Sequence, residues 1–195
     1  MKLQPAAFAV CKSCMLSPIN TATELLQRSL LAGGIPEEDA QEILPEMLKR
    51  FLDRYLEHCL EYTAFYPDAL AMLERFSNYR QAILTNKPLA HTEKILRGLG
   101  IWNRFEAVVP GDGPLGKKPD PAGLAYILSS LKVSANEAVL IGDSMQDLQT
   151  AKAAGCNFIA YLNGFGNRKE LEAGSGFSVQ AWNEFPDVMR RMEQT

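Results

Sequence analysis

The stretch Ala138-Val139-Leu140-Ile141-Gly142-Asp143-Ser144 decides how this chain folds. Its four consecutive apolar residues predict a buried strand. A Gly-Asp-Ser turn follows directly, and residues 147–154 after it predict a helix. A buried strand that passes through a short turn into a helix is typical of a parallel sheet covered by helices on both faces.

The same alternation of strand and helix extends over the chain from residue 67 onward. Because ligands bind beyond the carboxyl ends of the strands in such sheets, residues at these ends are candidates for a site. Cys11, Thr85, Gly111 and Asp143 all fall there. We therefore expect a doubly wound α/β domain with a crevice at these residues. The expected strands are 6–11, 81–85, 105–109, 138–141 and 158–162, and the expected helices are 67–76, 89–99, 121–131, 147–154 and one from about 182.

Residues 17–66 differ from the rest because they predict helices and no strand. A capping-box pattern at Thr21 predicts a helix to residue 31. Pro36 and Pro45 each suit the first turn of a helix, so we expect two further helices, the last of them long and amphipathic. The expected organisation is a core domain of residues 1–16 and 67–195, with a small helical domain of residues 17–66 inserted after the first strand.

Composition favours an ordinary globular protein, since 47% of the 195 residues are hydrophobic and the net charge is −3. This charge gives no reason to expect a nucleic acid or a membrane surface as partner. No apolar run approaches the ~20 residues of a membrane span. With four cysteines and no signal-peptide pattern at its start, the chain is expected in the cytoplasm with reduced thiols.

Four residues near the expected strand ends suit the chemistry of phosphate. Asp143 and Asp147 lie four apart, and two converging carboxylates suit Mg²⁺. Thr85 offers a hydroxyl, and the turn that follows it offers backbone N–H groups for phosphate oxygens. Lys118 precedes a proline, and a fixed ammonium can neutralise a phosphate or a crowded carboxylate. Each pattern alone is also common in turns and on surfaces.

Taken together and in this order, three motifs resemble the second, third and fourth signature motifs of the haloacid dehalogenase superfamily, which is mostly phosphatases. They are Leu84-Thr85-Asn86-Lys87-Pro88, Gly116-Lys117-Lys118-Pro119-Asp120-Pro121 and Gly142-Asp143-Ser144-Met145-Gln146-Asp147. The resemblance extends from residue 66 to 166 and is strongest to the phosphoglycolate phosphatase branch. It implies a fold of that superfamily with a helical cap, and a phosphorylated small molecule as ligand.

The resemblance also implies roles for individual residues. Thr85 and Asn86 would bind the transferring phosphoryl group, and Lys118 would hold its charge. Asp143 would ligate Mg²⁺, the cofactor of the family, and Asp147 would support the ligand shell of the metal. A contact with a protein partner through the helical cap is a further expectation.

The first motif of the superfamily, an Asp-x-Asp-x-Thr, has no match. The corresponding stretch is Phe8-Ala9-Val10-Cys11-Lys12-Ser13, with Ala9 at the nucleophile position and Cys11 at the acid/base position. An alanine methyl can neither attack phosphorus nor bind a metal. We therefore expect a phosphoglycolate-phosphatase-like protein that is hydrolytically defective and still binds a phosphorylated small molecule. Whether the chain is an enzyme stays open.

Two other functions remain open. One is a working Mg²⁺-dependent phosphatase with unusual residues at its first motif. The other is a thiol function at Cys11 and Cys14, which form a Cys-x-x-Cys. A zinc site needs about four ligands, and the remaining candidates are scattered along the chain: Cys59, Cys156, His58 and His91. A cysteine phosphatase loop would need an arginine six residues after Cys11, where the chain has Ser17.

Overall fold

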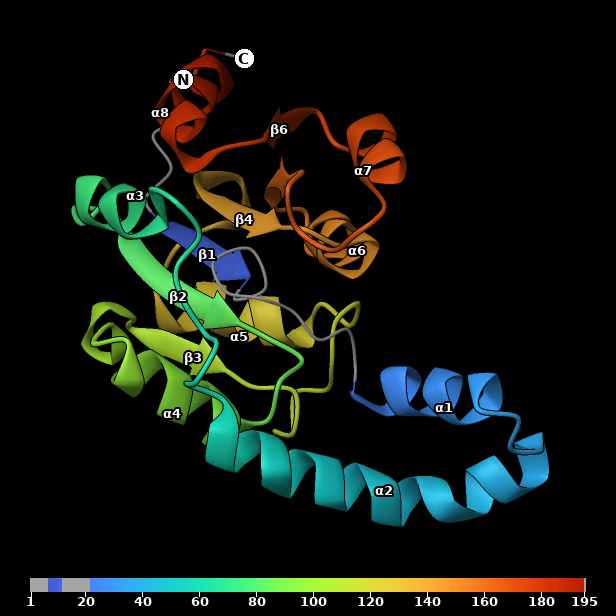
Figure 1. Cartoon of the computed structure of the whole chain (residues 1–195). Helices are drawn as coiled ribbons and strands as arrows, with labels where there is room; N and C mark the ends of the chain where they lie inside the picture. Colours follow the sequence, from blue (N-terminus) through green and yellow to red (C-terminus); the bar gives the residue numbers. More distant parts are fainter. Residues whose placement is uncertain (1–6, 12–21, 195) are drawn as a thin grey trace.

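The computed structural model describes residues 7–11 and 22–194. Figure 1 shows a twisted sheet flanked by helices on both faces, with a helical arm at one side. The six described strands follow the order β3-β2-β1-β4-β5-β6, and every pair is parallel. The predicted α/β architecture with parallel strands is therefore confirmed. The strands are β1 (Ala7–Cys11), β2 (Arg80–Leu84), β3 (Ala107–Val109), β4 (Ala138–Gly142), β5 (Asn157–Tyr161) and β6 (Phe177–Val179).

Sequence patterns identified five of these strands and missed β6. Each predicted strand lies within two residues of an observed one. β6 has three residues, and it follows a helix, α7 (Arg168–Gly174), that was also unexpected. Neither segment carries an apolar run or period long enough to indicate its structure, so both depend on packing against the rest of the sheet.

The remaining core helices pack on the two faces of the sheet and bury two apolar clusters. Ile83 belongs to one cluster, whereas its neighbours Ala82 and Leu84 belong to the other. This alternation follows from the opposite orientation of successive side chains in a strand. No helix in the described part of the chain is long and apolar enough to cross a membrane. These helices are α3 (Ala69–Arg75), α4 (Leu89–Gly98), α5 (Ala122–Ser130), α6 (Met145–Ala153) and α8 (Phe185–Met192), with 3₁₀ turns at Trp102–Arg104, Ala135–Glu137 and Trp182–Glu184.

The inserted segment forms an arm of two described helices, α1 (Ala22–Ala32) and α2 (Glu37–His58). The prediction that Pro45 opens a separate helix is wrong, because Pro45 lies inside α2. A proline in this position removes one backbone hydrogen bond, and the helix continues through it. Pro36 precedes the first residue of α2 as expected. The capping box expected at Thr21 lies outside the described residues.

The carboxyl-terminal turns of α2 are attached to α4 and to the turn before it. Lys87 Nζ donates to the Tyr55 hydroxyl at 3.0 Å, and Lys94 Nζ donates to the Leu56 carbonyl at 2.6 Å. The His91 ring pairs with the Leu52 carbonyl at 2.9 Å. The division into a core and a cap of residues 17–66 stays a prediction.

The centre of the sheet provides a first test of the fold. Leu140 in β4 is fully buried, so Leu140→Ala should lower the free energy of unfolding by about 2–5 kcal/mol. Tyr126 on α5 is 52% exposed, and Tyr126→Ala should change it by no more than about 0.5 kcal/mol. Urea denaturation of both variants measures the difference. Equal losses would contradict this placement of β4.

Candidate functional site

The carboxyl ends of β1, β2 and β4 meet at one edge of the sheet. Thr85 directly follows β2, and Asp143 directly follows β4, with β1 between the two strands. In the backbone register, Cys11 lies opposite Leu84, one residue before Thr85. Ala9 lies deeper in the sheet, opposite Ala82 and Leu140.

This register bears on the first motif. Ala9 pairs three residues before both Thr85 and Asp143, whereas Cys11 is the last residue of β1. Cys11 therefore stands closer than Ala9 to the level of the crevice. The assignment of either residue to the position of the nucleophile stays a prediction.

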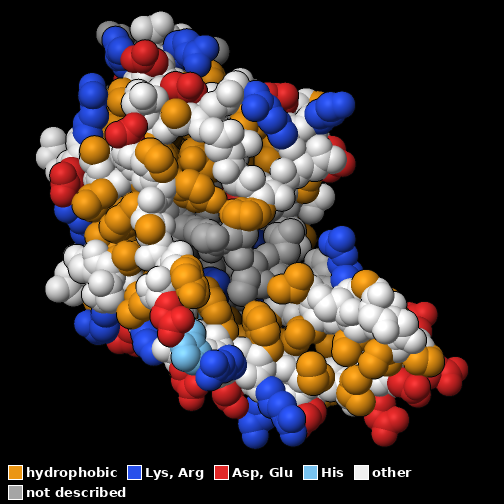
Figure 2. Space-filling model, in the orientation of Figure 1, with side chains coloured by type: hydrophobic (Ala, Val, Ile, Leu, Met, Phe, Trp, Pro, Cys, Tyr) orange, Lys and Arg blue, Asp and Glu red, His pale blue; other side chains and the backbone are white. Residues whose placement is uncertain are grey.

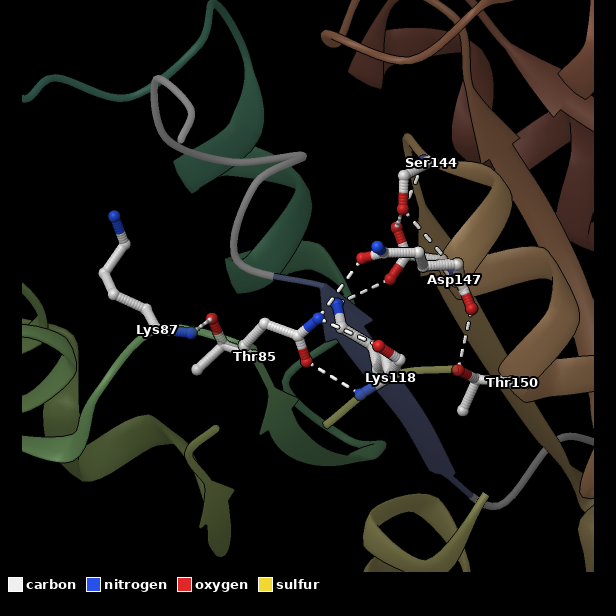
Figure 3. Close-up of polar contacts among 8 residues, drawn as sticks. Thr85, Lys87, Lys118, Ser144, Asp147 and Thr150 are labelled. Carbon is white, nitrogen blue, oxygen red and sulfur yellow. Dashed lines mark hydrogen bonds and ion pairs between the residues drawn. The ribbon is translucent and has the colours of Figure 1, made fainter. Parts of the chain in front are cut away.

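A buried ion pair joins two of the three motifs. Lys118 Nζ lies 2.5 Å from Asp147 Oδ1, and the side chains are 5% and 0% exposed. The other carboxylate oxygen of Asp147 accepts hydrogen bonds from Ser144, at 3.1 Å from the backbone N–H and at 2.6 Å from the hydroxyl. Both oxygens of Asp147 are thus engaged within the protein (Figure 3).

Asn86 connects this ion pair to the second motif. Its Oδ1 accepts from the Lys118 backbone N–H at 2.7 Å, and its Nδ2 donates to the Lys118 carbonyl at 3.0 Å. The same Nδ2 donates to Gln146 Oε1 at 3.2 Å. In this arrangement the Asn86 amide holds the backbone of Lys118, so the expected contact of Asn86 with phosphate stays a prediction.

Thr85 lies beside this group and is 7% exposed. Its backbone N–H donates to the Val109 carbonyl at 3.0 Å, and its hydroxyl oxygen accepts from the Lys87 N–H at 3.1 Å. A hydroxyl that accepts such a bond still carries a proton of its own to donate. The Lys87 side chain points away from the Lys118 and Asp147 pair (Figure 3).

Asp143 is held by the turn that follows β5. It is 2% exposed, and its Oδ2 accepts from the Phe165 N–H at 3.1 Å. A Cβ atom on Gly164 would lie 2.2 Å from the Asp143 Cβ, so any side chain there would displace the carboxylate. Sequence patterns did not indicate this role for the turn, although a Gly-Phe-Gly after a predicted strand can mark a close approach of another part of the chain.

The described residues offer few protein ligands for Mg²⁺, the cofactor expected from the family. No group of three or more His, Cys, Asp or Glu in residues 7–11 and 22–194 is arranged to hold a metal. Both oxygens of Asp147 are engaged, and residues 1–23 contain no Asp, Glu or His at all. Protein-bound Mg²⁺ relies on one or two carboxylates and its substrate. Asp143 alone therefore makes a weak anchor.

The cysteines with described side chains are Cys59 and Cys156, both free and buried. Burial raises the pKa of the Cys156 thiol to about 12, so it stays protonated and unreactive at neutral pH. Cys14 and the side chain of Cys11 lie outside the described structure, so a thiol function there stays an open prediction.

Comparison with known proteins identifies the family. Residues 15–161 match the haloacid dehalogenase-like hydrolases, and the chain belongs to this family. A phosphoglycolate phosphatase of Colwellia psychrerythraea is 33% identical over 176 residues, which cover 88% of this chain and 78% of that protein. The phosphoglycolate phosphatase of Pseudomonas putida is 34% identical over 160 residues, 80% of this chain and 58% of its own length. The chain thus spans little more than half of the second relative.

Solved structures with low sequence identity share the fold. A predicted phosphoglycolate phosphatase from Haemophilus somnus aligns with a TM-score of 0.77 at 16% identity, covering 95% of this chain and 98% of that one. A putative phosphoglycolate phosphatase from Lactobacillus plantarum gives 0.77 at 19% identity, covering 95% and 99%. These likenesses confirm the haloacid dehalogenase-like α/β fold. The family match begins at residue 15, so it includes all three recognised motifs but not β1.

The buried ion pair should be a strong energetic link. Lys118→Met leaves the Asp147 charge buried without its partner, so the free energy of unfolding should fall by about 3–5 kcal/mol. Adding Asp147→Asn removes this charge and should recover at least about 1 kcal/mol. Urea denaturation of the single and double variants measures the coupling. Purely additive losses would show that the two groups do not interact.

The stability of the fold should depend on the side-chain amide of Asn86 as a hydrogen-bond donor. Asn86→Asp places a carboxylate against the Lys118 carbonyl, so it should destabilise the fold by about 1–3 kcal/mol and by more than Asn86→Ala does. Asn163→Asp is the matched control, because the Asn163 amide also donates to a carbonyl, at 2.7 Å from Gln180 O, on the exposed surface. Urea denaturation again gives the values. A larger effect at Asn163 than at Asn86 would contradict the role given to Asn86.

Proposed function

We propose that this member of the haloacid dehalogenase-like hydrolases binds a phosphorylated small molecule at the strand ends without hydrolysing it. One observation carries the proposal: residues 1–23, which include β1, contain no Asp or Glu. The proposal therefore holds whether Ala9 or Cys11 stands at the position of the nucleophile. Neither residue can form the acyl phosphate that an aspartate nucleophile forms.

Covalent hydrolysis of a phosphate ester needs an attacking group in line with the leaving oxygen and an acid to protonate that oxygen. The two carboxylates of the crevice, Asp143 and Asp147, make contacts with other groups of the protein. Asp147 pairs with Lys118 and Ser144, and Asp143 accepts from the Phe165 backbone. Both lie beyond β4, across the crevice from β2, so we assign them to the support of the site and not to attack.

Binding depends on other groups, and these are present. In this proposal the Thr85 hydroxyl and the backbone N–H groups of the turn after β2 donate hydrogen bonds to the phosphate oxygens. The Lys118 ammonium neutralises the negative charge of the phosphate. The Lys118 ammonium then interacts with Asp147 and with the bound phosphate at the same time. Without the two carboxylates of the first motif, the crevice repels an anion less than a complete site of the family would. We assign Asp143 as a ligand of Mg²⁺ only when a bound phosphate supplies further oxygen ligands to the metal.

The remainder of the ligand is assigned to a small, partly open hollow between α2 and the turn after β2. Aromatic and apolar side chains form its α2 side, where burial raises the pKa of Tyr55 to about 12 and keeps its hydroxyl protonated. Residues 17–66 act as the cap in this proposal, and residues 1–16 and 67–195 as the core. The hollow is lined by Ala22, Phe51, Leu52, Tyr55, Asn86, Lys87 and Pro88.

Titration with inorganic phosphate, followed by ³¹P NMR, tests the binding site. Lys118→Met should weaken binding by roughly tenfold or more, because a buried charged hydrogen bond contributes about 1.5–3 kcal/mol. The neighbouring Lys117 is exposed, so Lys117→Met is a matched control that should leave the affinity unchanged. Equal effects of the two variants, or no binding by the unaltered protein, would refute the phosphate site.

Restoring carboxylates tests the missing chemistry. The register suggests comparing two double variants, Ala9→Asp with Cys11→Asp, and Cys11→Asp with Ser13→Asp. Turnover of an aryl phosphate should appear in one of them in the presence of Mg²⁺, and the unaltered chain should show none. Turnover by the unaltered chain above ~1 s⁻¹, lost in Lys118→Met, would overturn the claim that hydrolysis is absent.

A further inference from the structure

The arm formed by α1 and α2 leaves much of its apolar surface open. Among its described residues 22–52, Ala40 is the single buried one. Leu25 and Leu31 on α1 are 46% and 41% exposed, and Ile43 and Met47 on α2 are 37% and 36% exposed. Figure 2 shows hydrophobic side chains along this arm, with acidic ones at its tip. Adjacent exposed apolar side chains on a projecting element mark a surface for interaction.

The apolar side chains of α2 form a ridge. Ile43, Met47 and Phe51 follow each other at intervals of four residues, which places them side by side on one face of the helix. Phe51 also lines the hollow between α2 and the core. The ridge therefore extends from the free part of the arm to the edge of the candidate site.

A row of charges runs beside this ridge. Glu42, Glu46, Arg50 and Arg54 also recur at intervals of four, and all four are exposed. Their order along the helix is acidic, acidic, basic, basic. Such a row complements an identical row that runs in the opposite direction, whereas two parallel rows would place like charges together. The sequence of α2 is thus self-complementary in the antiparallel orientation.

The ridge is centred on residue 47 and the charge row on residue 48, so the two centres lie one residue apart along the helix. If two α2 helices cross antiparallel at Met47, Ile43 lies opposite the partner's Phe51, and Met47 lies opposite the partner's Met47. In the neighbouring row, Glu42 then faces the partner's Arg54, and Glu46 faces the partner's Arg50. Each contact between different residues occurs twice, as a two-fold axis requires, and the contact between the two Met47 side chains lies on the axis. The existing contact of Arg50 with Glu46, at 2.8 Å, joins side chains 75% and 63% exposed, so re-pairing costs little.

We propose that the arm is a dimerisation surface on which a second copy of this chain packs, with the two α2 helices antiparallel. The arm is two helices wide, and α2 is about 33 Å long. Its exposed face is on the order of 500 Å² in projection, the same order as the ~800 Å² that each partner buries in a standard interface. A different helical partner would have no reason to match a pattern that complements itself.

Sedimentation equilibrium over about 1–200 µM, the range in which interfaces of modest area dissociate, tests the proposal. The mass should rise from 21.6 kDa towards twice that value, about 43 kDa. Met47→Asp should raise the dissociation constant of the dimer roughly tenfold or more. Gln41→Asp is the matched control, since Gln41 is exposed on the opposite side of α2 from Ile43. A monomer at every concentration would refute the proposal, as would equal effects of the two variants.

Charge reversal tests the antiparallel orientation and preserves the apolar ridge. Glu42→Arg with Glu46→Arg makes the whole row basic, and Arg50→Glu with Arg54→Glu makes it acidic. Each double variant alone should be monomeric because its copies repel. An equimolar mixture should again form a dimer, and this dimer should weaken as salt is raised. Circular dichroism confirms that both variants are folded. Folded variants that do not associate on mixing would refute the antiparallel pairing.

Discussion

The buried ion pair between Lys118 and Asp147 is the interaction on which the site depends. A charge taken out of water is tolerated only when a partner and further hydrogen bonds compensate it. Here Ser144 provides hydrogen bonds to Asp147, and Asn86 holds the backbone of Lys118. The loop before α5, the turn after β2 and the first turn of α6 are consequently fixed relative to one another. Three motifs far apart in the sequence become one rigid group.

In the proposed function, this rigid group provides the contacts for binding. A fixed ammonium and a hydroxyl at the ends of parallel strands suffice to hold a phosphate, because they act through position and charge. Hydrolysis requires in addition a group that reacts, and in this family β1 is where such a group is expected. In the present chain β1 ends at Cys11, and no carboxylate occurs before Glu24. This absence of a carboxylate is the basis of the proposal that the chain binds a phosphate ester without hydrolysing it.

The sequence predicted the sheet well because each long strand carries a continuous apolar run and ends at a polar turn, as Ala138 to Asp143 does. It predicted which motifs meet, because strand ends meet by topology. It did not predict the contacts between them. Asn86 and Asp147 were assigned to ligands, and only the three-dimensional arrangement shows their side chains bound to Lys118. These contacts depend on loop geometry, which no local pattern records.

In the helical arm, too, a local sequence pattern failed to predict the structure. Pro45 indicated a helix boundary from local chemistry, yet the helix passes through it. A proline removes one hydrogen bond, and the bonds of the surrounding turns outweigh that loss. The backbone register adds what a linear comparison lacks, because it places Cys11 opposite Leu84 and Ala9 opposite Ala82. Such positions are set by pairing between strands, which the sequence of one strand does not determine.

The most direct test of a site that binds phosphate esters without hydrolysing them is a ³¹P NMR experiment at equal concentrations of protein and a phosphomonoester, with Mg²⁺ present. We predict that the ester signal shifts or broadens on binding, that it does so much less with Lys118→Met, and that no inorganic phosphate appears over many hours. Steady release of inorganic phosphate by the unaltered protein, absent from the Lys118→Met variant prepared in the same way, would contradict this conclusion.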